Sequence, residues 1–84
     1  MQLNDAIKSR LAHFMEERHL SHFKLSCNAG LNPSQLNDFI RGRITYPRID
    51  TLYLWCEAMN ITLDDFFRDP LFDIENIEVK DNKD

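Results

Sequence analysis

The sequence predicts an all-α domain of five helices. Apolar residues recur at the spacing of an amphipathic helix along most of the chain, and only two glycines and three prolines interrupt the pattern. A hydrophobic content of 43% with nine aromatic residues favours a packed core over disorder. A chain of 84 residues is long enough for one domain with a small core.

The first helix is expected from about residue 3 to residue 18. Its apolar residues fall on one side of a helix, and polar residues occupy the other side. The residues expected to face the core are Leu3, Ile7, Leu11, Phe14 and Met15.

Two short helices separated by a tight turn follow. Ser21 is a suitable N-cap because its hydroxyl can accept from the free backbone N–H groups of the next turn, and Gly30 ends the helix because a residue without Cβ enters the left-handed conformation freely. Asn32 caps the next helix, and Pro33 fits its first position, where a missing N–H is no loss. The expected ranges are 22–29 and 33–41. The pair has the geometry of a helix-turn-helix, in which the second helix enters the major groove of DNA.

The fourth and fifth helices complete the predicted domain. The fourth is expected over residues 49–59, and the fifth begins at the Thr62 cap and reaches Phe67. Asp64 and Asp65 lie in the first turn of the fifth helix, where the helix dipole favours acidic residues.

The spacing of these caps, glycines and apolar residues resembles that of the Cro/C1-type helix-turn-helix repressors of bacteria and phages. In that family a Ser cap opens the second helix, a Leu follows four residues on and a Gly five residues later, which Ser21, Leu25 and Gly30 match. A later Gly in the loop after the third helix is matched by Gly42. The resemblance covers residues 7–67 and implies a five-helix, lambda-repressor-like DNA-binding domain with the helix-turn-helix at helices two and three.

Two positions depart from the family pattern. Members commonly carry an Arg at the position of Met15 and a Glu at that of Ile40, which form a buried ion pair between the first and third helices. Both residues are apolar here, and joint replacement of a buried pair by side chains that pack is compatible with the fold. The second departure is His22, where the family often has Gln.

Base-reading residues are expected on the outer face of the third helix. If Leu36, Phe39 and Ile40 face the core, a step of about 100° per residue turns the intervening polar residues toward the groove. The expected readers, whose polar groups can bond base edges, are Ser34, Gln35, Asn37 and Asp38. Asp38 would repel phosphates unless it meets a donor or pairs with Arg41. The same residues also suit a solvated helix face, and this alternative stays open.

Phosphate contacts are expected around the helix pair. Arg43 and Arg48 flank the loop after the third helix, where repressors of this type touch the DNA backbone, and the N-terminus of the second helix offers free N–H groups. The expected set is Ser21, His22, Arg41, Arg43 and Arg48. Each arginine alone is more often a plain surface charge, so the expectation rests on their clustering.

The net charge of −4 is divided unevenly along the chain. Seven basic and four acidic residues give +3 over residues 1–48, whereas three basic and ten acidic residues give −7 over residues 49–84. This asymmetry would orient the molecule on DNA. The helix-turn-helix domain is expected to span residues 1–69, and residues 70–84 are expected to form an acidic C-terminal tail, partly disordered in its last four residues.

The fourth helix is apolar around most of its circumference, although a peripheral helix of a small domain needs only one apolar side. Tyr53 and Leu54 are therefore expected in a homodimer interface, since helix-turn-helix proteins usually bind two half-sites as dimers. In the alternative, the helix is buried within its own domain and the C-terminal tail folds over it.

Several other classes of protein are disfavoured. No apolar run approaches about 18 residues and no signal peptide is present, so a cytoplasmic protein without a membrane anchor is expected. Cys27 and Cys56 lack metal-ligand spacing, so two reduced thiols are expected, with no metal or cofactor. No small-molecule ligand is evident, and no paired carboxylates, Cys/His dyad or Gly-rich phosphate loop indicates an enzyme.

The predicted partner is double-stranded DNA. The leading interpretation is a sequence-specific DNA-binding transcriptional regulator, expected to be a repressor, that reads a near-palindromic operator as a dimer. The alternative is a protein-interaction module of the same fold, such as an antitoxin or an anti-repressor-like partner, whose acidic surface binds another protein. The charge distribution favours DNA binding.

Overall fold

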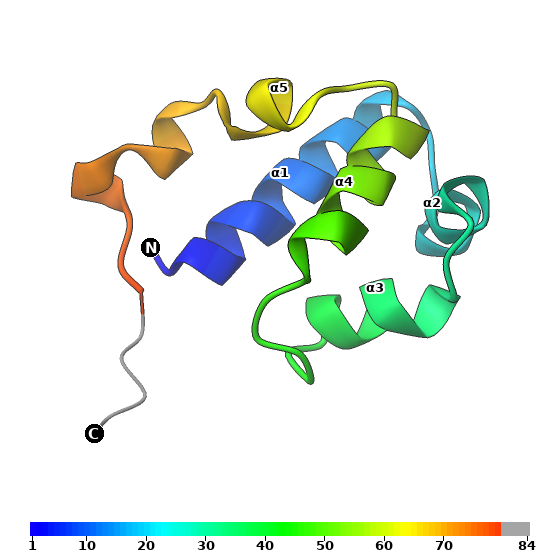
Figure 1. Cartoon of the computed structure of the whole chain (residues 1–84). Helices are drawn as coiled ribbons and strands as arrows, with labels where there is room; N and C mark the ends of the chain where they lie inside the picture. The colour runs from blue at the N-terminus through cyan, green and yellow to red at the C-terminus, as the bar shows by residue number, and fades with distance from the viewer. Residues whose placement is uncertain (80–84) are drawn as a thin grey trace.

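The computed structural model of the protein describes residues 1–79 and contains five α-helices followed by two short 3-10 helices (Figure 1). The prediction of an all-α fold with five helices is confirmed. The elements are α1 (Leu3–Glu17), α2 (His22–Ala29), α3 (Pro33–Ile40), α4 (Ile49–Ala58), α5 (Leu63–Phe67), η1 (Pro70–Phe72) and η2 (Ile74–Asn76). Within the described range no strand forms, and one isolated β-bridge pairs Gln2 with Glu78.

The predicted N-caps all form. The Ser21 hydroxyl accepts from the Lys24 N–H at 3.1 Å, and the Asn32 side chain accepts from the N–H of the second helical residue at 2.9 Å. Thr62 and Asp65 form a reciprocal capping box, whose hydrogen bonds stabilise the Asp65 carboxylate and lower its pKa. Three helices end one residue earlier than expected, because Arg18, Arg41 and Met59 are C-cap residues.

Four residues with positive φ follow helix ends. Gly30 (φ 72°) and Gly42 (φ 83°) need the left-handed region, as the sequence predicts. His19 (φ 54°) and Asn60 (φ 59°) adopt the same conformation after α1 and α4. The chain therefore turns sharply at the end of each of its four longer helices.

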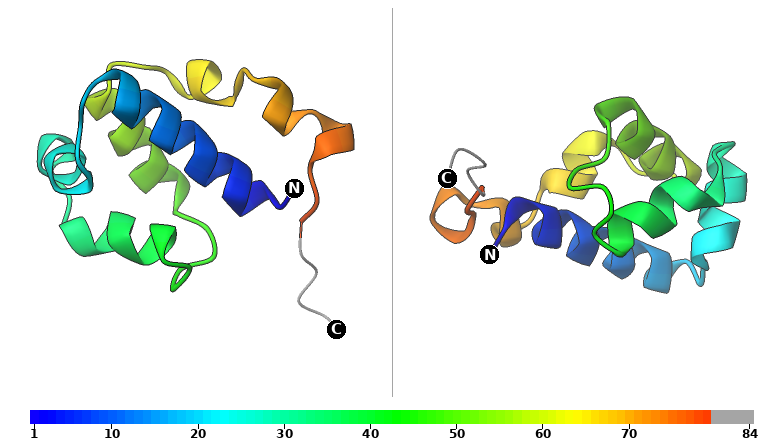
Figure 2. Two further views of the ribbon diagram at one scale, coloured as in Figure 1. Left: turned by 180° about the vertical axis from the view of Figure 1, so that it is seen from behind. Right: turned by 90° about the horizontal axis from the view of Figure 1, so that it is seen from below.

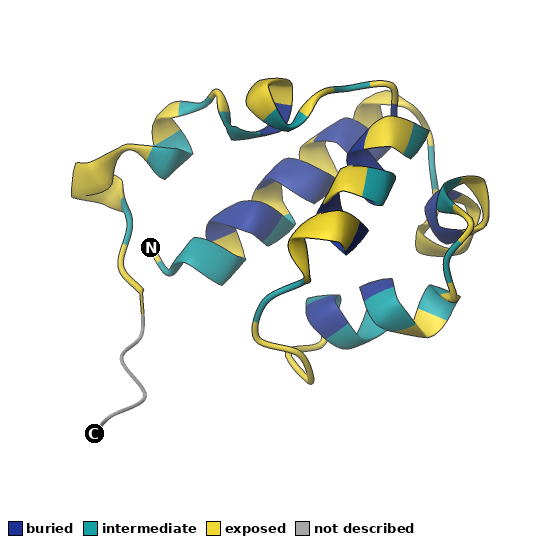
Figure 3. Ribbon diagram, in the orientation of Figure 1, coloured by how far each residue is buried: buried dark blue, intermediate teal, exposed yellow. Residues whose placement is uncertain are grey.

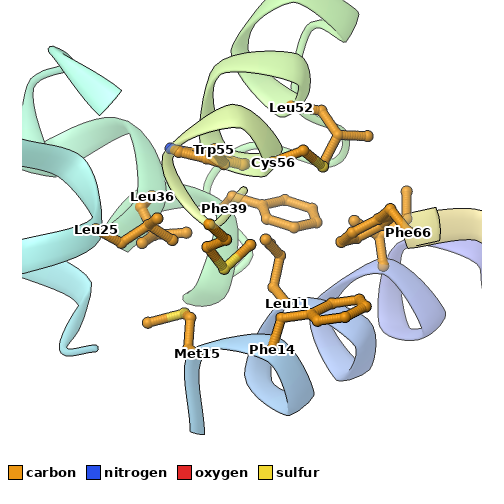
Figure 4. Close-up of a cluster of buried hydrophobic side chains, with 12 residues drawn as sticks. Leu11, Phe14, Met15, Leu25, Leu36, Phe39, Leu52, Trp55, Cys56 and Phe66 are labelled. Atoms are coloured by element: carbon orange, nitrogen blue, oxygen red, sulfur yellow. The ribbon is translucent and has the colours of Figure 1, made fainter. Parts of the chain in front are cut away.

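The core lies where α1, α2, α3 and α4 converge, and Phe66 of α5 closes one side of it (Figures 3 and 4). Leu25, Leu36 and Phe39 have no exposed surface, and Phe39 stacks on Trp55 with ring centroids 6.2 Å apart. Burial raises the pKa of the Cys56 thiol to about 11, so this cysteine stays protonated at neutral pH. The core thus holds α3 in place through its inward side chains.

The segment after α5 packs on the domain. Phe72 contacts the rings of Phe66 and Phe67, with centroids 6.3 and 4.9 Å away. The Glu78 N–H donates to the Met1 carbonyl oxygen at 2.8 Å, so residues 70–79 run beside the first turn of α1 (Figure 2). The disorder expected at the end of the tail concerns residues outside the described range.

Candidate nucleic-acid interface

The turn between α2 and α3 positions the third helix. The Leu31 N–H donates to the Ser26 carbonyl oxygen at 2.9 Å, and the Gly30 N–H donates to that of Cys27 at 3.1 Å, which closes the C-terminus of α2. α2 contacts both α3 and α4, and α3 lies on the side of the molecule opposite α5 (Figure 1). This arrangement leaves the outer face of α3 free to enter a groove.

The four expected base readers on α3 differ in how far their side chains are exposed to solvent. Ser34 is exposed, whereas Gln35, Asn37 and Asp38 are partly buried. The Gln35 amide oxygen is itself buried and has no hydrogen-bond partner. The structure therefore brings the four residues onto one helix, with Gln35 turned furthest toward the core.

Asp38 is bound to the loop that follows its helix. Its carbonyl oxygen accepts from the N–H groups of Arg43 at 2.8 Å and Ile44 at 3.2 Å. Its carboxylate lies 3.5 Å from the Arg43 guanidinium, so the ion partner is Arg43 and not Arg41, the residue three positions on. The turn at Gly42 folds the chain back over the end of α3 and brings Arg43 closer than helical spacing alone would suggest.

The expected phosphate contacts are at the surface. Ser21 and His22 are exposed at the N-terminus of α2, and Arg41 is exposed at the end of α3. Arg48 pairs with Asp50 at 3.2 Å, although both side chains remain more than half exposed. An exposed ion pair of this kind contributes little stability, so a DNA phosphate can replace the Asp50 carboxylate as the partner of Arg48.

Two basic residues of the positive half have structural roles that sequence reasoning missed. The Arg10 Nε donates to the Phe66 carbonyl oxygen at 2.8 Å, and the Arg18 Nε donates to that of Met59 at 2.7 Å. Arg10 is only 8% exposed. Arg10 lies three residues after Ile7, on the apolar stripe of α1. This position in the sequence could have indicated that Arg10 is buried.

The basic groups left for DNA are therefore fewer than the charge count suggests. Lys8 lies over the Phe39 ring and 4.0 Å from the Asp5 carboxylate, which leaves Lys24, Arg41, Arg43 and Arg48. Residues 49–79 carry eight acidic residues and one arginine, and they lead away from α3 through α5 (Figure 2). The electrostatic asymmetry is preserved in space and favours an approach of DNA to the α3 side.

Other kinds of site find little support in the described residues. No group of three metal-ligating side chains comes together in residues 1–79. Cys27 and Cys56 are both free thiols. None of the helices described here has the length and apolar character needed to cross a bilayer.

The comparisons with known proteins agree with this geometry. A family model described as a Cro/C1-type HTH DNA-binding domain matches residues 10–70. The chain belongs to the Cro/C1-type helix-turn-helix family. The crystal structure of the prophage Lp1 protein 11 superposes on this Cro/C1-type domain with a TM-score of 0.77 at 27% identity, over 87% of this chain and 97% of that one. No curated protein sequence matches the chain.

Membership confirms the resemblance and the fold expected from the sequence, and it identifies the protein as a DNA-binding regulator of the Cro/C1 type. In this Cro/C1-type domain α2 and α3 are the helix-turn-helix, and both lie within the matched residues. The individual contacts to bases and phosphates remain predictions.

Proposed function

We propose that this protein is a sequence-specific transcriptional repressor that acts as a homodimer on a near-palindromic operator. The observation that carries the proposal is a polar outer face on α3, in a chain whose helix-turn-helix belongs to a DNA-binding family. Leu36 and Phe39 fix the opposite face of α3 in the core, so the helix presents its polar side as a rigid unit. A repressor of this kind works where bacterial DNA lies, in the cytoplasm.

Base preference is assigned to Ser34, Gln35, Asn37 and Asp38. An Ala substitution at a true reader should weaken binding to the selected site by about 1–3 kcal/mol and affect random DNA much less. Quantitative binding assays on both DNAs measure the difference. If all four substitutions leave the selected motif unchanged, the outer face of α3 is merely solvated.

Phosphate binding is assigned to Arg43 and Arg48, with Arg41 and the α2 N-terminus at Ser21 and His22 as further contacts. Replacing Arg43 or Arg48 with Ala should weaken all DNA sites alike and reduce the slope of log affinity against log salt by about 1. Arg68→Ala, at an exposed position after α5, is a matched control that removes the same positive charge. A variant that alters the preferred sequence and keeps the wild-type slope would contradict this assignment.

Selection from random oligonucleotides with the purified protein tests the function as a whole. Enrichment of an inverted repeat would support both sequence-specific binding and a symmetric dimer. Enrichment of a single asymmetric half-site would retain the DNA-binding role and reject the dimer. No enrichment at low salt would reject the proposed function.

The protein-interaction alternative has one observation in its favour. Ile74 is 96% exposed and Val79 is 61% exposed, and both lie among acidic residues on the segment after α5. Exposed apolar side chains in an acidic setting suit a basic protein partner. If oligonucleotide selection fails, capture of one defined protein that an Ile74→Asp variant no longer binds would favour this alternative.

A further inference from the structure

A small cavity lies directly behind the proposed DNA-reading helix. Its volume is about 100 Å³, and it lies between α3, the loop after it and α4, with one side open to solvent. The lining residues that matter are Gln35, Phe39, Tyr46, Thr51 and Trp55. Three of these are aromatic, and no buried charged group lines the cavity.

Two of the lining residues carry buried polar atoms without a partner. Trp55 is 1% exposed, and its indole N–H has no acceptor. The Gln35 amide oxygen is buried and has no donor. The indole N–H can only donate and the amide oxygen can only accept, and a buried polar group without a partner is unfavourable.

We propose that this cavity binds a small uncharged molecule with a flat apolar body and one hydroxyl group. A hydroxyl can accept from an indole N–H and donate to an amide oxygen at the same time, and we assign the hydroxyl of the ligand to these two atoms of Trp55 and Gln35. The aromatic walls suit a flat ring. Phenol is the simplest molecule with this chemistry.

The size of the cavity fits a ligand of this class. A cavity of about 150 Å³ lined by apolar side chains holds a benzene ring. This cavity is smaller, but Ile44 and Arg48 at its margin are exposed, so one edge of a ring can stay in solvent.

Occupation should also affect DNA binding, an inference that rests on the proposed function. A ligand bonded to Gln35 holds that side chain toward the core, whereas reading a base requires it to turn outward. The ligand and DNA would therefore compete for one side-chain position. Each should lower the affinity of the other by the same factor.

The protein contains one tryptophan, so Trp55 reports on the cavity without labelling. Phenol and fluorobenzene are matched probes of nearly equal size, of which only phenol carries a hydroxyl. In the absence of DNA, phenol should shift the Trp55 emission and the indole N–H resonance in a saturable way. Fluorobenzene should bind about five- to hundredfold more weakly, because it lacks the two hydrogen bonds.

Two variants and a control locate the binding. Gln35→Leu removes the acceptor and should reduce the preference for phenol to what the one bond from Trp55 supplies, and Thr51→Leu should fill the cavity and prevent saturation by both probes. Ser34→Ala, the neighbouring exposed position on α3, should bind phenol as the wild type does. Circular dichroism establishes that all three variants are folded.

The outcomes separate the ligand site from its effect on DNA. Absence of saturation by either probe, or equal affinities for both, would overturn the site and leave a cavity filled by water. If the site exists, saturating phenol should lower DNA affinity several-fold in the wild type and not in Gln35→Leu. Phenol binding with unchanged DNA affinity would overturn the competition. Failure of all DNA binding would reject the proposed function and leave the DNA-free result standing.

Discussion

The buried Arg10 shows how one residue can have a different role from its neighbours of like charge. Its guanidinium lies over the Phe14 ring and donates to two carbonyl oxygens at the end of α5, those of Asp65 and Phe66. It also approaches the Asp69 carboxylate at 3.4 Å. These contacts tie α1 to the C-terminus of α5, where unpaired carbonyl groups need donors. Arg10 is thus a structural residue of the domain.

Replacing Arg10 with Met should destabilise the domain without touching the DNA surface. The carbonyl oxygens of Asp65 and Phe66 would lose their donors, at a cost of about 2–3 kcal/mol in the free energy of unfolding. Urea denaturation measures the change. Arg41→Met, at an exposed position, is the control and should change stability by less than about 0.5 kcal/mol. Equal denaturation midpoints for the two variants would mean that the Arg10 contacts contribute nothing.

At the scale of the helices, boundaries were predictable to within one residue. Ser21, Asn32 and Thr62 cap by bonds to the next turn, and Gly30 and Gly42 end helices by their own conformation. Such signals act over a few residues and are therefore visible in the sequence. The apolar stripe of α3 also predicts which residues lie on its outer face, because helical periodicity places them opposite the stripe.

Contacts between elements were not predictable in the same way. The pairing of Asp38 with Arg43 depends on how the loop folds back over α3, and the 3-10 helices after α5 depend on packing against α1. The cavity behind α3 needs three segments of chain brought together. Helical periodicity contains no information on such juxtapositions, so they cannot be predicted from it.

Met15 and Ile40 stand where the family commonly has an ion pair, and we predict that their side chains meet between α1 and α3. Met15 is 6% exposed, and Ile40 packs against the same core cluster. Ile40→Glu alone should bury an unpaired carboxylate and lower the free energy of unfolding by about 3–5 kcal/mol, and added Met15→Arg should recover part of the loss. Thermal melts of the single and double variants measure the coupling. Strictly additive effects would show that the two side chains do not meet.

At the scale of the whole molecule, charge and shape are arranged along one axis. The α3 side carries the exposed Arg41, Arg43 and Arg48, and the acidic segment after α5 lies on the other side of α1 (Figure 1). With Arg10 and Arg18 engaged in the fold, one domain presents few basic groups to DNA. Affinity for phosphates grows with the number of contacts, so two domains on one operator would bind far more tightly than one.

The surface of α4 offers a place for that second domain. Ile49 is 66% exposed and Tyr53, one turn later, is 49% exposed, so residues 70–79 do not cover this face as the alternative supposed. Leu54 is partly buried beside them. A hollow of about 270 Å³ continues from Tyr53 to Ile61 and Leu63 at the start of α5. Exposed apolar groups next to a hollow are typical of an interface between subunits.

A charge placed on this surface should separate the subunits and weaken operator binding. Leu54→Glu or Tyr53→Asp should give a folded monomer in sedimentation velocity that has lost most of its affinity for a palindromic site, because each half-site would then be bound alone. Ile74→Glu, at a 96% exposed apolar residue away from α4, adds the same charge as a control and should remain dimeric with normal affinity. Two recognition helices related by a twofold axis lie about 34 Å apart on one face of DNA. Half-sites moved to a spacing other than one helical turn should therefore reduce wild-type affinity and leave that of the monomeric variants unchanged. A Leu54→Glu protein that stays dimeric and binds normally would place the interface on another surface.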